Sequence, residues 1–157
     1  MEKTSATVVA DHAEVEQFLE LVSFILGEEE FGVDILKIQE INKMLAITPV
    51  PDAPGYVKGV INLRGRIIPI VDLRCRFGFP EREPDKNTRI VVAELGGKIV
   101  GLVVDAVMEV MRISSSVFEP PPQFLTGAQS EYITAVGKLD DRLLLLLDLD
   151  RVLESAA

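Results

Sequence analysis

Short apolar runs, separated by glycine, proline and charged residues, recur along this chain and predict β-strands. Gly96-Gly97 lies between two such runs, and paired glycines favour the tight turns that match strand twist. Asp140-Asp141 separates two others, and aspartate is a common turn residue. The predicted strands cover residues 18–26 with 31–33, 88–95 with 98–104, 107–113, and 132–139 with 142–147. The pattern therefore predicts a mainly β chain built from hairpins.

Local signals refine this pattern. Asp34 precedes apolar residues at 35, 38 and 41, which favours a short helical turn capped by Asp34 and continued by an extended segment. Residues 148–154 predict a short terminal helix. Asn62-Leu63-Arg64-Gly65 predicts a tight turn in which Gly65 takes a positive φ at little steric cost. Pro69 cannot donate to a ladder, so its strand is predicted to be an edge strand or bulged.

An internal repeat is the most informative feature of the chain. Residues 56–73 align without gaps to residues 132–149 at a shift of 76, with six identities in eighteen positions. A weaker repeat, L-G-x-x-x-x-G, begins at Leu26 and at Leu95. We infer two related β units of roughly 70 residues, each small for independent stability. Closure into barrels removes exposed strand edges, and packing two barrels together leaves a seam that suits a helix.

Net charge and composition exclude several functions. The chain has 157 residues, is 48% hydrophobic, and carries a formal charge of −9, which argues against a nucleic-acid partner. The charge is uneven, because residues 41–90 hold nine bases and five acids between two acidic flanks. Such a basic middle either docks an acidic protein surface or merely solvates one face. His12 and Cys75 are the only histidine and cysteine, which argues against metal sites and catalytic dyads, and a buried Cys75 is expected.

No apolar run reaches the roughly 18 residues that a membrane span needs, and the start lacks the pattern of a signal peptide. We therefore expect a cytoplasmic protein without direct membrane insertion. Residues 1–16 are expected to form a flexible acidic tail, and residues 17–157 a single domain. The second barrel is expected at about residues 80–150.

The inventory of reactive groups is poor. Asp140-Asp141 occupies a predicted hairpin tip, and Ser114-Ser115-Ser116 follows a strand with no base nearby in the sequence. No glycine-rich phosphate loop is present, since Gly96-Gly97 is a hairpin turn. Nothing here predicts an activated nucleophile, a metal site or a cofactor. The sequence indicates a module that works by contact.

Three segments, NLRGRIIPIVDLR (residues 62–74), GLVVDAVMEVMRI (101–113) and FGVDILKIQEI (31–41), give the chain a close resemblance to the CheW family of bacterial chemotaxis coupling proteins. The resemblance covers about residues 18–153. It implies two intertwined SH3-like five-stranded β-barrels with short helices. It also implies a non-enzymatic adaptor without a cofactor, which couples methyl-accepting chemoreceptors to the regulatory domain of the histidine kinase CheA within membrane-associated receptor arrays.

The resemblance also implies contact residues. Arg64 matches a family arginine involved in coupling, and its guanidinium suits bidentate bonds to a carboxylate. A local bond that pins the turn is the simpler interpretation of Arg64, as ordinary core packing is for the isoleucines. Gly101 either admits a partner helix closely or relieves strand curvature. The expected receptor- and kinase-binding residues are Ile35, Ile38, Glu40, Ile41, Arg64, Thr88, Gly101 and Val107.

Two other functions remain open on the sequence. The same kind of scaffold serves non-flagellar chemosensory pathways, such as twitching or biofilm control. A β-barrel that carries a small ligand is a different class, and it predicts an enclosed cavity where the adaptor predicts a shallow apolar groove. An enzyme is the least favoured alternative.

Overall fold

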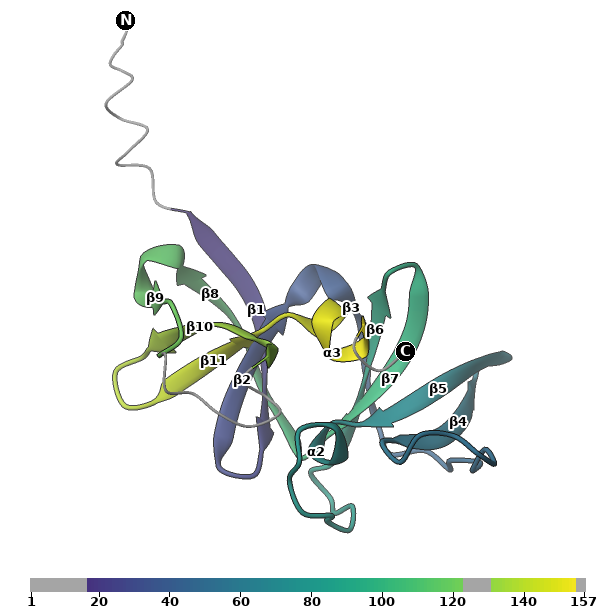
Figure 1. Ribbon diagram of the computed structural model, residues 1–157. Coiled ribbons are helices and arrows are strands. Elements are labelled where there is room, and N and C mark those ends of the chain that lie inside the picture. The colour runs from purple at the N-terminus through teal and green to yellow at the C-terminus, as the bar shows by residue number, and fades with distance from the viewer. Residues whose placement is uncertain (1–16, 123–130, 155–157) are drawn as a thin grey trace, which may run out of the picture.

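The computed structural model describes residues 17–122 and 131–154, and the expected acidic tail of residues 1–16 lies outside them. The described chain is mainly β, with short helices (Figure 1). The strands are β1 (Phe18–Leu26), β2 (Glu29–Asp34), β3 (Ile38–Lys43), β4 (Val57–Leu63), β5 (Arg66–Asp72), β6 (Arg89–Leu95), β7 (Lys98–Val104), β8 (Ala106–Ser114), β9 (Phe118–Glu119), β10 (Ile133–Lys138) and β11 (Leu143–Leu147). The α-helices are α2 (Leu73–Arg76) and α3 (Leu149–Glu154), and the 3₁₀ turns are η1 (Ile35–Lys37) and η2 (Ser115–Val117).

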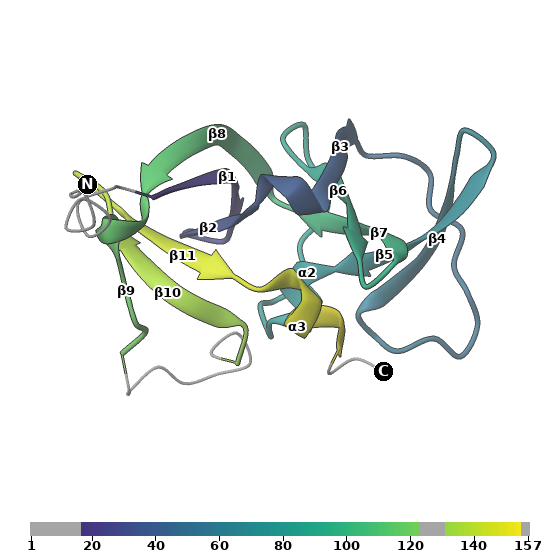
Figure 2. The same cartoon turned by 90° about the horizontal axis from the view of Figure 1, so that it is seen from above.

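The strands form two sheets, which lie side by side in Figures 1 and 2. One sheet has six strands in the order β8-β1-β2-β11-β10-β9, and the other has five in the order β3-β6-β7-β5-β4. The chain therefore crosses between the sheets twice, after Asp34 and again at Asp105. The expected second barrel of residues 80–150 is wrong in its bounds, because β6 and β7 join the sheet of β3 to β5. Strand pairing is non-local, and local patterns do not specify it.

Both sheets are extended by the chain that follows an edge strand. After β3 the chain reaches Thr48, which exchanges two backbone hydrogen bonds of 2.9 Å with Val60 of β4, at the opposite edge of the same sheet. After β8, η2 leads directly into β9, which pairs with β10. The result is two SH3-like units, one of which has six strands where five were expected.

The larger core is shared by the two sheets. It combines Phe24 and Phe31 of the six-stranded sheet with Val91 and Leu102 of the five-stranded sheet, and α2 and α3 add Leu73 and Val152. A smaller core fills the inside of the five-stranded sheet and consists of Ile61, Leu63, Ile68, Ile70, Ile90 and Val92. Burial of this apolar surface is the main term that holds the two units together.

The internal repeat is visible in the backbone contacts. The N–H of Asp72 donates to the carbonyl of Tyr56 (2.7 Å), and the N–H of Asp148 donates to that of Tyr132 (2.9 Å). Asp72 then caps α2, as Asp148 accepts from the first N–H groups of α3. The parallel ladders also correspond. Gly32 of β2 lies opposite Leu146 of β11, and Gly101 of β7 lies opposite Ile70 of β5, so that Ile70 and Leu146 are again 76 residues apart. The alignment of residues 56–73 with 132–149 is thus structural.

The predictions for single residues have mixed outcomes. Asp34 caps η1 through the N–H of Leu36 (2.9 Å), as predicted. Pro69 is not on an edge strand, because β5 lies between β4 and β7. The parallel ladder to β7 begins only at Ile70, so the missing N–H of Pro69 interrupts no pair of that ladder. Cys75 is exposed, contrary to expectation, because it lies on the outer side of α2. No helix of the described residues is long and apolar enough to cross a membrane.

Candidate functional site: two depressions and an exposed strand

The turn between β4 and β5 presents Arg64 to the surface. Arg64 and Gly65 both have positive φ, +54° and +83°, and the Asn62 side chain accepts a hydrogen bond from the N–H of Gly65 (2.9 Å). A positive φ was expected for the glycine but not for the arginine, which pays a steric cost there. The Arg64 side chain is 68% exposed. The turn therefore holds a charged side chain outward from the end of the hairpin.

Arg64 forms an ion pair with Glu40 of β3. Glu40 also accepts a hydrogen bond from the Asn42 side chain (3.1 Å). The hydrogen bond from Arg64, and secondarily that from Asn42, lowers the pKa of Glu40 below its ordinary value, and the same pair raises the pKa of Arg64. The structure thus brings together two of the expected contact residues.

The isoleucines of the expected contact strip do not share one environment. Ile35 and Ile38 are half-buried against the shared core, whereas Ile41 is exposed on β3. Leu36, which is not among the expected contact residues, is 87% exposed at the crossover between the sheets. A helical pattern places Leu36 beside the apolar stripe, but the chain turns through only three residues of 3₁₀ helix and points Leu36 outward.

Thr88, Gly101 and Val107 lie apart from Arg64 and belong mainly to the interior. Thr88 is buried, and its hydroxyl accepts a hydrogen bond from the N–H of Asp85 (2.8 Å). Gly101 is also buried, and a Cβ there would lie 2.5 Å from Ile70 Cδ1. Val107 is half-buried against the shared core. Thr88 is reached only from the second depression, and Gly101 makes room for a core isoleucine.

β8 carries an exposed apolar surface that sequence reasoning missed. Val110 lies opposite Val22 in the β1–β8 ladder, and Val22 lies opposite Val33 in the β1–β2 ladder. Directly opposed side chains share a face of the sheet, so the three valines form a row. Val22 and Val33 are buried, whereas Val110 is 62% exposed and the nearby Met108 is 55% exposed. Val110 and Met108, here called the β8 surface, extend the shared core to solvent.

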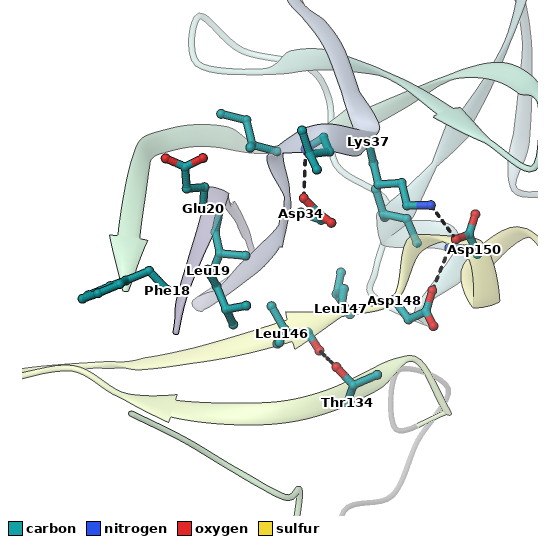
Figure 3. Close-up of a pocket in the computed structure, with 14 residues that line it drawn as sticks. Phe18, Leu19, Glu20, Asp34, Lys37, Thr134, Leu146, Leu147, Asp148 and Asp150 are labelled. Atoms are coloured by element: carbon teal, nitrogen blue, oxygen red, sulfur yellow. Dashed lines mark hydrogen bonds and ion pairs between the residues drawn. The ribbon is translucent and has the colours of Figure 1, made fainter. Parts of the chain in front are cut away.

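The first depression, of about 560 Å³, lies between β1 and β11 where β2 leaves the sheet (Figure 3). Lys37 of η1 and Asp150 of α3 form an ion pair of 3.0 Å at its rim. The hydrogen bond to Asp150 raises the pKa of Lys37. Its lining consists of Phe18, Leu19, Glu20, Leu21, Asp34, Ile35, Leu36, Lys37, Thr134, Leu146, Leu147, Asp148, Leu149 and Asp150.

The second depression, of about 510 Å³, lies beside the loop that precedes β6. Asp105, buried at its margin, accepts hydrogen bonds from the Arg74 guanidinium (2.6 Å), the N–H of Gly27 (2.8 Å) and the Arg82 guanidinium (3.1 Å). Its lining consists of Met44, Ile47, Lys58, Asp72, Arg74, Glu81, Arg82, Glu83, Pro84, Thr88, Val103 and Asp105. Within residues 17–122 and 131–154, no group of three or more His, Cys, Asp and Glu side chains could hold a metal ion.

Comparisons with known proteins agree with this architecture. Residues 20–157 match the family described as the CheW-like domain. The chain is 41% identical to a chemotaxis protein CheW of Klebsiella aerogenes (87% of this chain, 82% of the relative) and 38% identical to one of Rhizobium meliloti (87% and 88%). The crystal structure of the scaffolding protein TtCheW from Thermoanaerobacter tengcongensis superposes with a TM-score of 0.80 at 38% identity, over 88% of this chain and 94% of that one. The chain therefore belongs to the CheW family.

Proposed function

We propose that this chain is a non-enzymatic adaptor that couples methyl-accepting chemoreceptors to the histidine kinase CheA, in the cytoplasm at a membrane-associated receptor array. Membership of the CheW family supports this function, because curated relatives are chemotaxis proteins and the solved relative is a scaffolding protein. The two partners are the cytoplasmic tip of the receptor and the regulatory domain of the kinase. A non-flagellar pathway would use the same two contacts with other partners.

The β8 surface is the observation that carries the receptor contact. A row of valines that begins in the core and ends exposed at Val110 leaves apolar area uncovered on an otherwise folded sheet. Leu36, three residues beyond Val33 at the other end of the row, is exposed as well. An amphipathic helix of the receptor tip buries such side chains with its apolar face.

The hairpin end at Arg64 supports a separate contact with the kinase. Arg64 and Glu40 are held as a charged pair on the five-stranded sheet, away from β8 of the six-stranded sheet. Because Arg64 is mostly exposed, a carboxylate of a partner can approach it without unfolding the turn. Two contacts on two sheets allow one chain to hold two partners at once, and each contact then strengthens the assembly through its high effective concentration.

The ligand-carrying barrel is less well supported. The inside of the five-stranded sheet is filled by six apolar side chains that include Ile61, Ile68 and Ile90. A filled interior of this kind resembles the packed core of a small barrel more than a cavity that holds a metabolite.

Co-sedimentation of the chain with receptor signalling tips and CheA tests the proposal, with stimulated kinase phosphorylation as a second measurement. Val110→Glu should abolish receptor co-sedimentation and kinase stimulation while leaving the fold intact, because Val110 is exposed. Leu143→Glu is the matched control, since Leu143 is 55% exposed on the same sheet but separated from β8 by β1 and β2. Equal co-sedimentation of the two variants would overturn the receptor contact, and absence of any stimulation by the unaltered chain would overturn the adaptor function.

A further inference from the structure

The six-stranded sheet splits at the first depression. β2 ends at Asp34, opposite Leu21, while β1 continues to Phe18 and stays paired with β8 on its other side. β11 pairs with β2 at only two positions, Leu145 and Leu146. The edges of β1 and β11 therefore face each other across the first depression (Figure 3). Edges of this kind offer backbone N–H and C=O groups to an added segment.

The side chains around this gap are apolar inside and acidic at the rim. Leucines of β1, β11 and α3 form most of the apolar lining, and Glu20, Asp34, Asp148 and Asp150 surround it. Lys37 is the one cation among the described residues of the lining, and it is already paired with Asp150. Asp148 is likewise paired with Arg151 (3.5 Å). Glu20 and Asp34 are the rim carboxylates outside these two ion pairs, and they favour a cationic occupant.

The internal repeat supplies a template for that occupant. In the five-stranded sheet, β6 corresponds to β1 and β5 corresponds to β11. The equivalent residues line both depressions: Lys58 and Asp72 line the second, and Thr134 and Asp148 line the first. In the second depression the segment Glu81–Pro84, which precedes β6, lies along the wall. Its Arg82 donates to Asp105 (3.1 Å). Asp105 and Asp34 both lie where the chain leaves one sheet for the other.

The corresponding segment of this chain, before β1, has the wrong charge for the same role. Between Lys3 and Lys37 the sequence contains no lysine or arginine, and Asp11, Glu14 and Glu16 precede the strand. These side chains would bring like charges to the acidic rim and offer no counterpart of Arg82. A cationic segment must then come from another protein.

We propose that the first depression binds an extended segment of a partner protein, in which a lysine or arginine is flanked by apolar residues. The segment adds to the free edge of β1, its apolar side chains meet the leucine lining, and its cation faces Asp34 and Glu20 as Arg82 faces Asp105. This contact goes beyond the proposed adaptor function. It shares Leu36 with the proposed receptor contact but includes neither the β8 surface nor Arg64. Glu20→Gln/Asp34→Asn therefore tests this contact and Val110→Glu tests the receptor contact.

The test uses two blocked heptapeptides, one with a central arginine between leucines and one with glutamate in place of the arginine, titrated into the ¹⁵N-labelled full chain. The arginine peptide should shift the amides of Leu19, Leu36 and Leu147. In the double variant Glu20→Gln/Asp34→Asn the dissociation constant of the arginine peptide should rise about fivefold or more, because two carboxylate charges are lost. Asparagine caps a helix as well as aspartate, so η1 is retained. Glu94→Gln/Glu119→Gln removes the same charge elsewhere and should bind normally.

Equal binding of the two peptides, shifts confined to another surface, or unchanged affinity in the Glu20/Asp34 variant would each overturn the proposal. A spin label attached at Ser5→Cys, in a chain that also carries Cys75→Ser, tests whether the chain's own first residues occupy the depression. Broadening of the Leu19 and Leu147 signals by this label would show that the chain's own first residues fill the gap, which would also overturn it. Absence of such broadening, together with binding of the arginine peptide alone, supports a partner segment.

Discussion

The rings of Tyr56 and Tyr132 lie against the same guanidinium group, that of Arg76, whose Cζ is 5.0 and 5.2 Å from the two ring centroids. The two tyrosines occupy equivalent positions of the internal repeat, so one arginine joins the two halves of the duplication. Its Nε also donates to the carbonyl of Val152 in α3 (3.1 Å). Arg76 therefore links the two units through polar contacts, in addition to the shared apolar core that is their main connection.

Replacing Arg76 by leucine should lower the free energy of unfolding by about 1–2 kcal/mol, through loss of two cation–π contacts and one hydrogen bond. The change is measured as a lower urea midpoint for the whole chain. Lys138→Leu, at an exposed position of β10, serves as the control. An unchanged midpoint for the Arg76 variant would show that the tyrosines pack equally well without the cation.

Reversing the pair of Arg64 and Glu40 separates a structural role of the ion pair from a role in contact. Arg64→Glu should weaken co-sedimentation with CheA, because it places two carboxylates together and removes the outward cation. The double variant Arg64→Glu/Glu40→Lys restores an ion pair with the charges exchanged. If the pair only pins the turn, the double variant regains binding. If Arg64 itself meets the partner, as proposed, the double variant remains defective while its urea midpoint recovers.

The pKa of Glu40 predicts a dependence of stability on pH. The hydrogen bond from Arg64 lowers this pKa below the ordinary 4.5. Since the folded pKa lies below the unfolded one, the carboxylate contributes stability above pH 4.5 and loses it as the pH falls through the folded pKa. The difference in urea midpoint between the unaltered chain and Glu40→Gln should be constant near neutral pH and shrink below pH 4.5. A difference that stays constant through acid would contradict the ion pair.

The equivalent glycines Gly101 and Gly32 should respond differently to alanine. A Cβ at Gly101 would lie 2.5 Å from Ile70 and 3.0 Å from Ile90, whereas at Gly32 its nearest neighbour, Leu144, lies at 3.3 Å. Gly101→Ala should cost about 1–3 kcal/mol of unfolding free energy, as overpacking does, and Gly32→Ala clearly less. Thermal unfolding of both variants measures this. Loss of partner binding in Gly101→Ala at full stability would instead identify Gly101 as a contact residue.

Features set by neighbouring residues were predictable from the sequence. The turn at Gly96-Gly97 needs positive φ at both positions, which paired glycines supply, and the structure has +58° and +82° there. The cap at Asp34 follows from an aspartate placed before a short apolar pattern. The repeat of residues 56–73 was readable because the same hairpin and cap are built twice.

Features set by distant residues were not predictable. Apolar alternation shows that β6 and β7 form a hairpin but not which sheet receives it, so the expected barrel boundary failed. The meeting of Arg64 with Glu40 depends on how the barrel closes, 24 residues apart. The exposure of Val110 and Leu36 was hidden because an exposed and a buried aliphatic side chain look alike in one sequence.

The double crossing of the chain at Asp34 and Asp105 has a consequence for how this protein can be altered. The five-stranded unit is the continuous stretch from β3 to β7, whereas the six-stranded unit is built from β1 and β2 before that stretch and β8 to β11 after it. A truncation from either end therefore removes strands of the six-stranded unit first, whereas two cuts, near Asp34 and Asp105, bound the five-stranded unit without severing its strands. The five-stranded unit can accordingly be exchanged as one block, which would replace the surface that carries Arg64 and leave that of Val110 in place.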